Sequence, residues 1–237
     1  GRIADLTPEF LGSGLSQTDI LKCWDLALDF LTPAQRAISD GSAVIIERSD
    51  VSIEAPVPRP GKLICVGLNY RDHAEESGMA IPASPIIFSK FSTSVIGPEA
   101  AIELPVGSSE VDYEAELAVV IGRYGRNIPA GDAMAYVFGY TNINDVSARD
   151  MQFADGQWQR GKSCDTFAPM GEFIATADEI ADPHGLRISF RLNGETLQDS
   201  NTKQMIFQIP DLIEFISRTI TLDPGDVIAT GTPPGVG

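Results

Sequence analysis

The chain has 237 residues, of which 43% are hydrophobic and 21% charged, as in globular proteins with one large domain and at most a small second one. Asp and Glu number 33 against 17 Lys and Arg, and the formal charge of −16 argues against a nucleic-acid partner, because such a surface repels phosphate groups. No apolar run approaches the roughly 18 residues of a membrane span, and no signal peptide is recognisable. The three cysteines, Cys23, Cys65 and Cys164, are too widely spaced for a disulfide framework or a zinc site, so we expect a cytoplasmic protein that does not associate with membranes.

The first part of the chain has the pattern of a helix. Within residues 15–40, apolar side chains recur at intervals of three and four residues, the spacing of one helix face. They are Ile20, Leu21, Trp24, Leu26, Ala27 and Phe30. Prolines at positions 56, 58 and 60 then mark a boundary. We therefore divide the chain into a small N-terminal region, residues 1–56, and a main domain, residues 57–237, which we expect to continue past its turn-like end.

Short strands dominate the predicted structure of the main domain. Runs rich in Val, Ile and Phe and bounded by Gly, Pro or Asp predict strands over 63–67, 86–88, 117–122, 137–142, 186–192 and 227–230. Helices are predicted over 70–78, 146–153 and 210–219. Strands and helices do not alternate regularly, so the pattern favours a mainly β, α+β domain over a doubly wound sheet.

Two glutamates stand where a predicted strand begins. Glu114 and Glu116 are two residues apart, so both point to the same face of that strand. Asp145 follows the next strand-like run, and three carboxylates without a thiolate suit a hard cation such as Mg²⁺ or Mn²⁺. A solvated strand start carries the same pair of glutamates, and spacing alone does not bring Asp145 to them.

A histidine and a glutamate share one face of the first predicted helix. His73 and Glu76 are three residues apart, and Asn69 is placed to cap the helix. A carboxylate beside an imidazole orients it as a general base that can activate water. A polar surface pair is the alternative interpretation. The second histidine, His184, stands in a turn-like segment, and we expect it at the surface.

Lys162 belongs to a glycine-bearing loop, residues 156–167. It is suited to stabilise a developing negative charge beside the carboxylates. The spacing Gly-x(4)-Gly-Lys-Ser of a phosphate-binding loop is formally present from Gly156 to Ser163. However, no apolar strand precedes it and Pro169 prevents a long helix after it, so we reject a nucleotide triphosphatase.

These segments, taken in order, resemble the fumarylacetoacetate hydrolase family. The matching strings are GLNYRDHAEE at 67–76, DYEAEL at 112–117, NDVSARD at 144–150, Gly-Lys-Ser at 161–163, PGDVI at 224–228 and Gly-Thr-Pro at 231–233. Each string is weak alone, but the ordered set spans residues 60 to 237. The resemblance implies a mixed β-sheet roll with a metal in a central cleft, and a homodimer.

The resemblance also implies a role for each candidate site residue. Glu114, Glu116 and Asp145 would hold Mg²⁺ or Mn²⁺, His73 and Glu76 would activate water, Lys162 would stabilise negative charge, and Arg149, Gln152 and Thr232 would contact the substrate. The expected activity is hydrolysis of a carbon–carbon bond in an acylpyruvate or a 2,4-diketo acid, including 2,4-diketo-3-deoxy sugar acids, with release of pyruvate or a related keto acid.

Three alternatives stay open. The same site would serve decarboxylation of oxaloacetate or keto–enol isomerisation of a related diacid. A non-catalytic module that binds a metal or ligand is the third alternative. The presence of His73, Glu76 and Lys162 argues against it, since a binding module needs no base for activating water.

Overall fold

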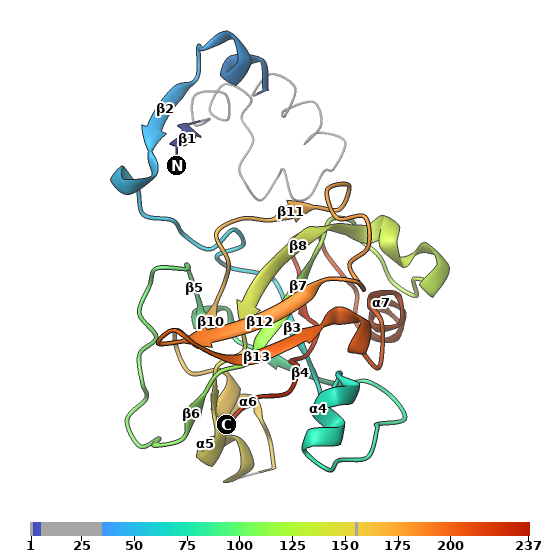
Figure 1. The fold of residues 1–237 in the computed structure, drawn as a ribbon. Coiled ribbons are helices and arrows are strands. Elements are labelled where there is room, and N and C mark those ends of the chain that lie inside the picture. Colours follow the sequence, from blue (N-terminus) through green and yellow to red (C-terminus); the bar gives the residue numbers. More distant parts are fainter. Residues whose placement is uncertain (1, 6–34, 155) are drawn as a thin grey trace.

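The computed structural model describes residues 2–5, 35–154 and 156–237 (Figure 1). In the N-terminal part, β1 (Arg2–Asp5) pairs antiparallel with β2 (Val44–Glu47). Residues 35–40 are helical, and the rest of the helix predicted within residues 15–40 lies outside the described residues, as does Cys23. The domain boundary near residue 56 stays a prediction.

The centre of the main domain is a six-stranded sheet in the order β11-β8-β7-β14-β3-β4 (Figure 1). Its strands are β3 (Leu63–Gly67), β4 (Ile86–Lys90), β7 (Ala115–Ile121), β8 (Val137–Asn144), β11 (Ala175–Thr176) and β14 (Val227–Ala229). β14 runs parallel to β3, and the other neighbouring pairs are antiparallel. A mixed sheet accompanied by short helices confirms the predicted α+β class.

Strand β7 is apolar along most of its length because both faces of the sheet are covered. Leu117 and Val119 belong to one buried cluster, and Ala118 and Val120 belong to a second, as the two-residue period of a strand requires. Helix α7 (Ile209–Ser217) supplies buried side chains to the first cluster. Burial of each large aliphatic side chain stabilises the fold by roughly 1.5–3 kcal/mol, so the sheet is a rigid base for residues at the ends of its strands.

A hairpin of β12 (Arg187–Leu192) and β13 (Glu195–Asn201) lies near β7. Its turn residues Asn193 and Gly194 both have positive φ, 52° and 86°, as in the type I′ turn that joins two antiparallel strands. The sequence analysis predicted only the first of these strands. The Asn-Gly pair was the signal that predicts the second.

The remaining described elements are short. They are η1 (Arg48–Asp50), α4 (Arg71–Glu76), η2 (Ser92–Ser94), β5 (Val95–Ile96), β6 (Val111–Asp112), η3 (Ala130–Tyr136), β9 (Ser147–Ala148), α5 (Arg149–Ala154), α6 (Gln159–Lys162), β10 (Ala168–Pro169) and η4 (Thr202–Gln204). The helix predicted over 146–153 begins only at Arg149, because β9 pairs with β6. Within the described ranges, every helix falls short of the length and apolar character that a membrane crossing requires.

Candidate active site

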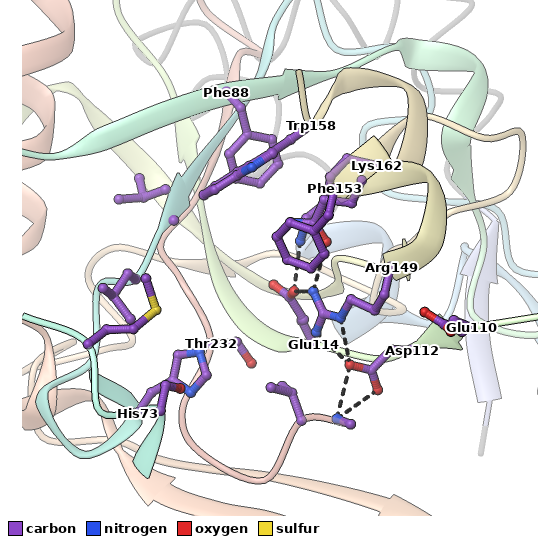
Figure 2. Close-up of a pocket in the computed structure, with 18 of the residues that line it drawn as sticks. His73, Phe88, Glu110, Asp112, Glu114, Arg149, Phe153, Trp158, Lys162 and Thr232 are labelled. Carbon is purple, nitrogen blue, oxygen red and sulfur yellow. Dashed lines mark hydrogen bonds and ion pairs between the residues drawn. The ribbon is translucent and has the colours of Figure 1, made fainter. Parts of the chain in front are cut away.

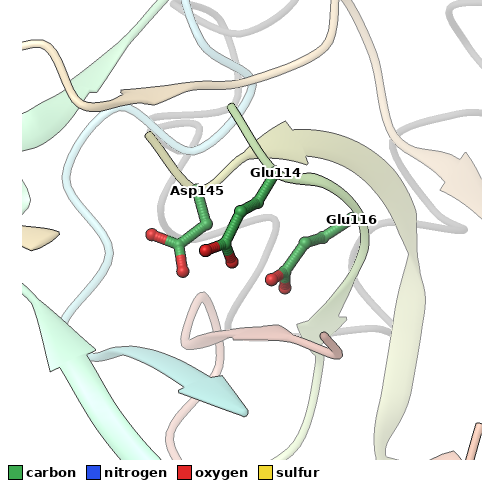
Figure 3. Close-up of side chains that lie close together, drawn as sticks. All are labelled: Glu114, Glu116 and Asp145. Atoms are coloured by element: carbon green, nitrogen blue, oxygen red, sulfur yellow. The ribbon is translucent and has the colours of Figure 1, made fainter. Parts of the chain in front are cut away.

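The ends of β7 and β8 bring three carboxylates together (Figure 3). Ala115 pairs with Asn144 in the antiparallel ladder, so Glu114 and Asp145 lie side by side just beyond it, and the Asp145 amide donates to the Glu114 carbonyl at 2.9 Å. One oxygen from each of Glu114, Glu116 and Asp145 lies within 4.8 Å of the others, and all three residues are buried. Closely spaced, buried, hard oxygen donors fit a divalent cation such as Mg²⁺ or Mn²⁺.

The electrostatics of this acidic triad differ from residue to residue. Burial, reinforced by the charges of Asp145 and Glu114, raises the pKa of Glu116 well above its ordinary value. Burial also acts to raise the pKa of Asp145, but the ammonium groups of Lys162 and Lys90 outweigh it, so that pKa lies below its ordinary value. The triad thus combines one carboxylate that resists ionisation with one that favours it.

Two buried lysines balance the triad. Lys162 Nζ lies 2.8 Å from Glu114 Oε1 and 2.7 Å from Asp145 Oδ2. Lys90 Nζ lies 2.6 Å from Asp145 Oδ1 and 2.9 Å from the carbonyl oxygen of Val146. Lys90 was not singled out in the sequence, where no local pattern distinguishes it from a surface lysine, and the structure adds it to the site.

Lys162 lies on the short helix α6 rather than in the predicted loop. Gly161, the residue before it, allows α6 to approach α5 closely, because a Cβ on Gly161 would lie 2.5 Å from the Gln152 nitrogen and 2.6 Å from the Ala148 oxygen. The close approach buries the Lys162 side chain to 2% exposure. Burial lowers the pKa of Lys162, but the nearby carboxylates raise it by more, so the ammonium stays charged.

Arg149 joins the acidic triad to a fourth carboxylate. Its guanidinium donates to Asp112 through Nε at 3.0 Å, and through Nη1 to Glu114 at 2.6 Å and to Gln152 Oε1 at 3.1 Å. Arg149 and Gln152, both predicted from the resemblance to contact substrate, are therefore brought together at the start of α5. Asp112 was not singled out in the sequence, and the structure adds it to the site.

His73 and Glu76 lie on α4, with His73 Nδ1 3.6 Å from Glu76 Oε2. This distance is too long for a hydrogen bond. Glu76 Oε2 instead accepts from the Gly235 amide at 3.1 Å, and His73 Nδ1 is buried and has no hydrogen-bond partner among the described residues. The predicted pair is therefore adjacent, with the imidazole nitrogen free.

The prediction that Asn69 caps this helix is wrong. The N-cap residue is Tyr70, and the Asn69 side chain is buried and bonds to other segments. Asn69 Nδ2 donates to the carbonyl oxygens of Phe207 at 3.0 Å and Thr230 at 2.8 Å, and its Oδ1 accepts from the Phe207 amide at 2.8 Å. Asn69 thus ties the start of α4 to the ends of two distant segments.

His184, which was predicted at the surface, is only partly exposed and bonds to a helix. His184 Nε2 accepts a hydrogen bond from the Ile209 amide, 3.2 Å away, at the start of α7. The side chain is only 18% exposed. His184 does not line the cavity beside Glu114, and it satisfies a backbone amide at the start of α7.

A cavity of about 630 Å³ extends from α4 to Glu114, the one member of the triad that lines it (Figure 2). Its polar lining residues include Glu114, Arg149, Gln152 and Lys162, and its aromatic ones are Phe88, Phe153 and Trp158. His73 and Thr232 also line it, and Figure 2 draws His73 on the far side of the cavity from Glu114. His73 thus lines the same cavity as two cations, Arg149 and Lys162, which are paired there with the carboxylates of Asp112 and Glu114.

The Thr232 hydroxyl is already bonded on both sides. It donates to the Ala115 carbonyl at 3.0 Å and accepts from Gln198 Nε2 at 2.9 Å. In the same turn, the Gly231 amide donates to Glu116 Oε2 at 2.8 Å. The turn therefore braces the triad as well as lining the cavity.

The fold and this site define a known class of protein. The family model "Fumarylacetoacetate (FAA) hydrolase C-terminal" matches residues 62–237, and the chain belongs to the fumarylacetoacetate hydrolase family. The mixed β-sheet roll implied by the resemblance is confirmed.

The chain is also similar to individual members of this family. The protein named "Oxaloacetate tautomerase Fahd2a, mitochondrial" from Rattus norvegicus is 55% identical over 208 residues, which are 87% of this chain and 66% of the rat protein. The chain thus spans just under two thirds of that relative. The structure of a fumarylacetoacetate hydrolase from psychrophilic Exiguobacterium antarcticum has a TM-score of 0.83 at 38% identity, covering 100% of this chain and 81% of that one. A 5-carboxymethyl-2-hydroxymuconate delta-isomerase from Mycobacterium smegmatis has a TM-score of 0.74 at 45% identity, covering 82% and 76%.

Proposed function

We propose that this chain catalyses keto–enol tautomerisation of a small 2-keto dicarboxylic acid such as oxaloacetate, at a site that holds Mg²⁺ or Mn²⁺. One observation carries the proposal: His73 lines the same cavity as Lys162, Arg149 and Glu114. The reaction needs a group that moves a proton and cations that stabilise an enolate, and this cavity has both. The tautomerase name of the rat relative and the isomerase name of the mycobacterial one support this choice.

Each step is assigned to residues of the cavity. Arg149 and Lys162 bind the anionic substrate and stabilise negative charge on its keto oxygen. His73 accepts a proton from the carbon beside the keto group, the C–H electron pair becomes part of the enol double bond, and the imidazolium returns the proton to oxygen. A divalent ion held by Glu114, Glu116 and Asp145 would add Lewis-acid polarisation of that oxygen. Gln152 and Thr232 fix the position of the substrate.

Hydrolysis of a carbon–carbon bond in an acylpyruvate or 2,4-diketo acid is the second candidate. The adjacency of His73 and Glu76 on α4 favours it, because the pair would activate water if the carboxylate moved within hydrogen-bond distance of Nδ1. In that reaction the water oxygen bonds to the acyl carbon, the carbon–carbon bond breaks, and the pyruvate enolate that leaves takes up a proton. Decarboxylation of oxaloacetate at the same site would release carbon dioxide without an attacking water.

A single set of assays separates these activities. The protein is incubated with Mg²⁺ or Mn²⁺ and oxaloacetate, and enol absorbance is followed beside pyruvate release; an acylpyruvate and a 2,4-diketo-3-deoxy sugar acid are tested in parallel. Accelerated enol–keto exchange without pyruvate release, lost in His73→Ala and retained in His184→Gln, supports the tautomerase. Release of pyruvate from the diketo acids supports hydrolysis. Release of pyruvate from oxaloacetate supports decarboxylation. Ion binding without turnover of any of these substrates leaves a binding module.

We also propose a homodimer, a cytoplasmic location and a division of the chain near residue 56, as the sequence predicts. The rat relative is named as mitochondrial, so the two locations are alternatives for the same family. Light scattering of the purified chain tests the dimer, and limited proteolysis near residue 56 tests the division.

A further inference from the structure

The two carboxylate oxygens of Asp145 are held by different lysines. Oδ1 accepts from Lys90 at 2.6 Å, and Oδ2 accepts from Lys162 at 2.7 Å. The Asp145 side chain is fully buried, with 0% exposure, so no solvent competes for either oxygen. The carboxylate is therefore held in one orientation, with a different environment on each side.

Lys90 and Lys162 are not equivalent. Lys162 lines the cavity and can meet a substrate, whereas the Lys90 side chain has 0% exposure and does not line the cavity. Lys90 ends β4, where it pairs with Leu63 of β3, and its ammonium also donates to the Val146 carbonyl at 2.9 Å. Its position is therefore fixed by the sheet and by the backbone next to Asp145, and a role in contacting substrate is excluded.

We propose that Lys90 is a positioning residue that holds Asp145 Oδ1 and so limits Asp145 to a one-oxygen ligand, through Oδ2. Lys162, the partner of Oδ2, also bonds Glu114 and lines the cavity, so it can turn toward a substrate when an ion binds, whereas Lys90 cannot. The proposal rests on the metal centre proposed above. Mg²⁺ and Mn²⁺ take six ligands in a compact octahedron, whereas Ca²⁺ takes up to eight and accepts a carboxylate through both oxygens. Lys90 would thus make the site select small six-coordinate ions against Ca²⁺.

The charge of Lys90 does not by itself explain such selectivity. Its removal strengthens the attraction of every divalent ion by a similar amount, because Mg²⁺ and Ca²⁺ carry the same charge. The ratio of two dissociation constants cancels this common effect. A change in the ratio therefore reports a change in how many oxygens of Asp145 can bind the ion.

Lys90→Met tests the proposal, with Lys62→Met as the matched control. Lys62 Nζ also pairs with a buried carboxylate, 2.8 Å from Asp226 Oδ2, but Asp226 lies beside Ile121, at the end of β7 opposite to Glu114. Calorimetric titration of metal-free protein with Mg²⁺ and with Ca²⁺ gives the ratio. We expect Lys90→Met to shift the ratio toward Ca²⁺ by about tenfold, as for other groups that orient a metal ligand. The Lys62→Met protein should keep the wild-type ratio.

A wild-type measurement keeps the test decisive if Lys90→Met does not fold. In a crystal of the wild-type protein grown with Mn²⁺, Asp145 should bind through Oδ2 alone, with Oδ1 still bonded to Lys90. A folded Lys90→Met protein with an unchanged ratio, or a two-oxygen Asp145 ligand in the wild-type crystal, would overturn the proposal. Wild-type protein that binds no divalent ion would instead overturn the metal centre itself.

Discussion

Asp145, Arg149 and Lys162 keep their charge in the interior because each one has partners of opposite sign. Lys162 is the clearest case, since its carboxylate partners raise its pKa despite burial. An ammonium that does not titrate in the working range of the protein cannot act as a base, but it can stabilise an enolate throughout that range. The sequence alone suggested Lys162 for this role, and its 2.7–2.8 Å contacts with two carboxylates give the reason that it stays cationic.

Removal of this charge should therefore reduce turnover. Lys162→Met deletes the ammonium and keeps most of the volume, and we expect kcat to fall about 100- to 1,000-fold, the usual loss when one preorganised stabilising group is removed. Lys203→Met, at an exposed lysine outside the cavity, is the control and should behave like the wild type. Steady-state kinetics with saturating Mg²⁺ measures the effect. A folded Lys162→Met protein with wild-type kcat would contradict the assigned role.

His184 makes the stability of the protein depend on pH. Burial outweighs Asp182 and Asp211 and lowers the pKa of His184 below its ordinary 6.5. Between these two pKa values the unfolded chain binds more protons, so the stabilising contribution is complete above 6.5 and is lost as the pH falls through the folded-state pKa. Protonation also removes the lone pair that accepts from Ile209. His184→Gln cannot titrate, so its melting temperature should fall less than that of the wild type on acidification below about pH 6.5. Parallel pH-dependent melting curves for the two proteins would refute this explanation.

Helix α4 depends on distant segments for its position, because its six residues are too few to be stable alone. Asn69 ties its start to Phe207 and Thr230, and Ser200 of β13 donates to Asp72, the residue before His73. The position of His73 is therefore set by a hairpin far away in the sequence.

Loss of the Ser200 hydroxyl should loosen α4 without unfolding the protein. Ser200→Ala removes one hydrogen bond, with a net contribution of about 0.5–1.5 kcal/mol, so we expect kcat to fall about two- to tenfold while KM changes little. Hydrogen exchange of the α4 amides should become faster in the same variant. Ser189→Ala, at an exposed serine on the neighbouring strand β12, should alter neither quantity. Unchanged exchange in Ser200→Ala would show that this bond does not hold the helix.

Prediction from sequence succeeded where a local pattern determines the structure. All six predicted strands are present with ends within two residues of the prediction, because hydrophobic runs between turns are a local signal. The predicted start of helix α5 and the predicted loop at Lys162 were wrong. Both positions depend on contacts between separate parts of the chain: the pairing of β9 with β6, and the contact of Gly161 with α5. The hydrophobic periodicity of the sequence does not report such contacts.

At the scale of the whole molecule, the site is assembled by the register of the sheet. The spacing of Glu114 and Glu116 was informative because both lie on one strand. Asp145 reaches them because β8 pairs with β7 in a particular register. Lys90, which ends β4, bonds to Asp145 although three strands separate β4 from β8 in the sheet. The family resemblance predicted that Asp145 lies near the two glutamates. The position of Lys90 beside Asp145 became known only from the structure.

The triad also links ion binding to the stability of the whole fold. Because burial and the neighbouring carboxylates raise the pKa of Glu116, its ionised form destabilises the metal-free fold above the ordinary value of 4.5, and this effect grows until the pH passes the folded-state pKa. Glu116→Gln should therefore melt at a higher temperature than the wild type at neutral pH without metal. A divalent ion at about 100 times its dissociation constant stabilises a folded protein by about 2.7 kcal/mol, which for a chain of this size is about 5–10 °C.

Melting scans with Mn²⁺ and with a chelator test both effects together. We expect Mn²⁺ to raise the wild-type melting temperature in a saturable way and the chelator to reverse the rise, whereas Glu116→Gln should lose the response because one ligand oxygen and one negative charge are gone. Glu103→Gln, at an exposed glutamate outside the triad, should respond like the wild type. If Mn²⁺ stabilises Glu116→Gln as much as the wild type, the ion binds elsewhere. If metal-free Glu116→Gln melts below the wild type, Glu116 does not destabilise the metal-free fold.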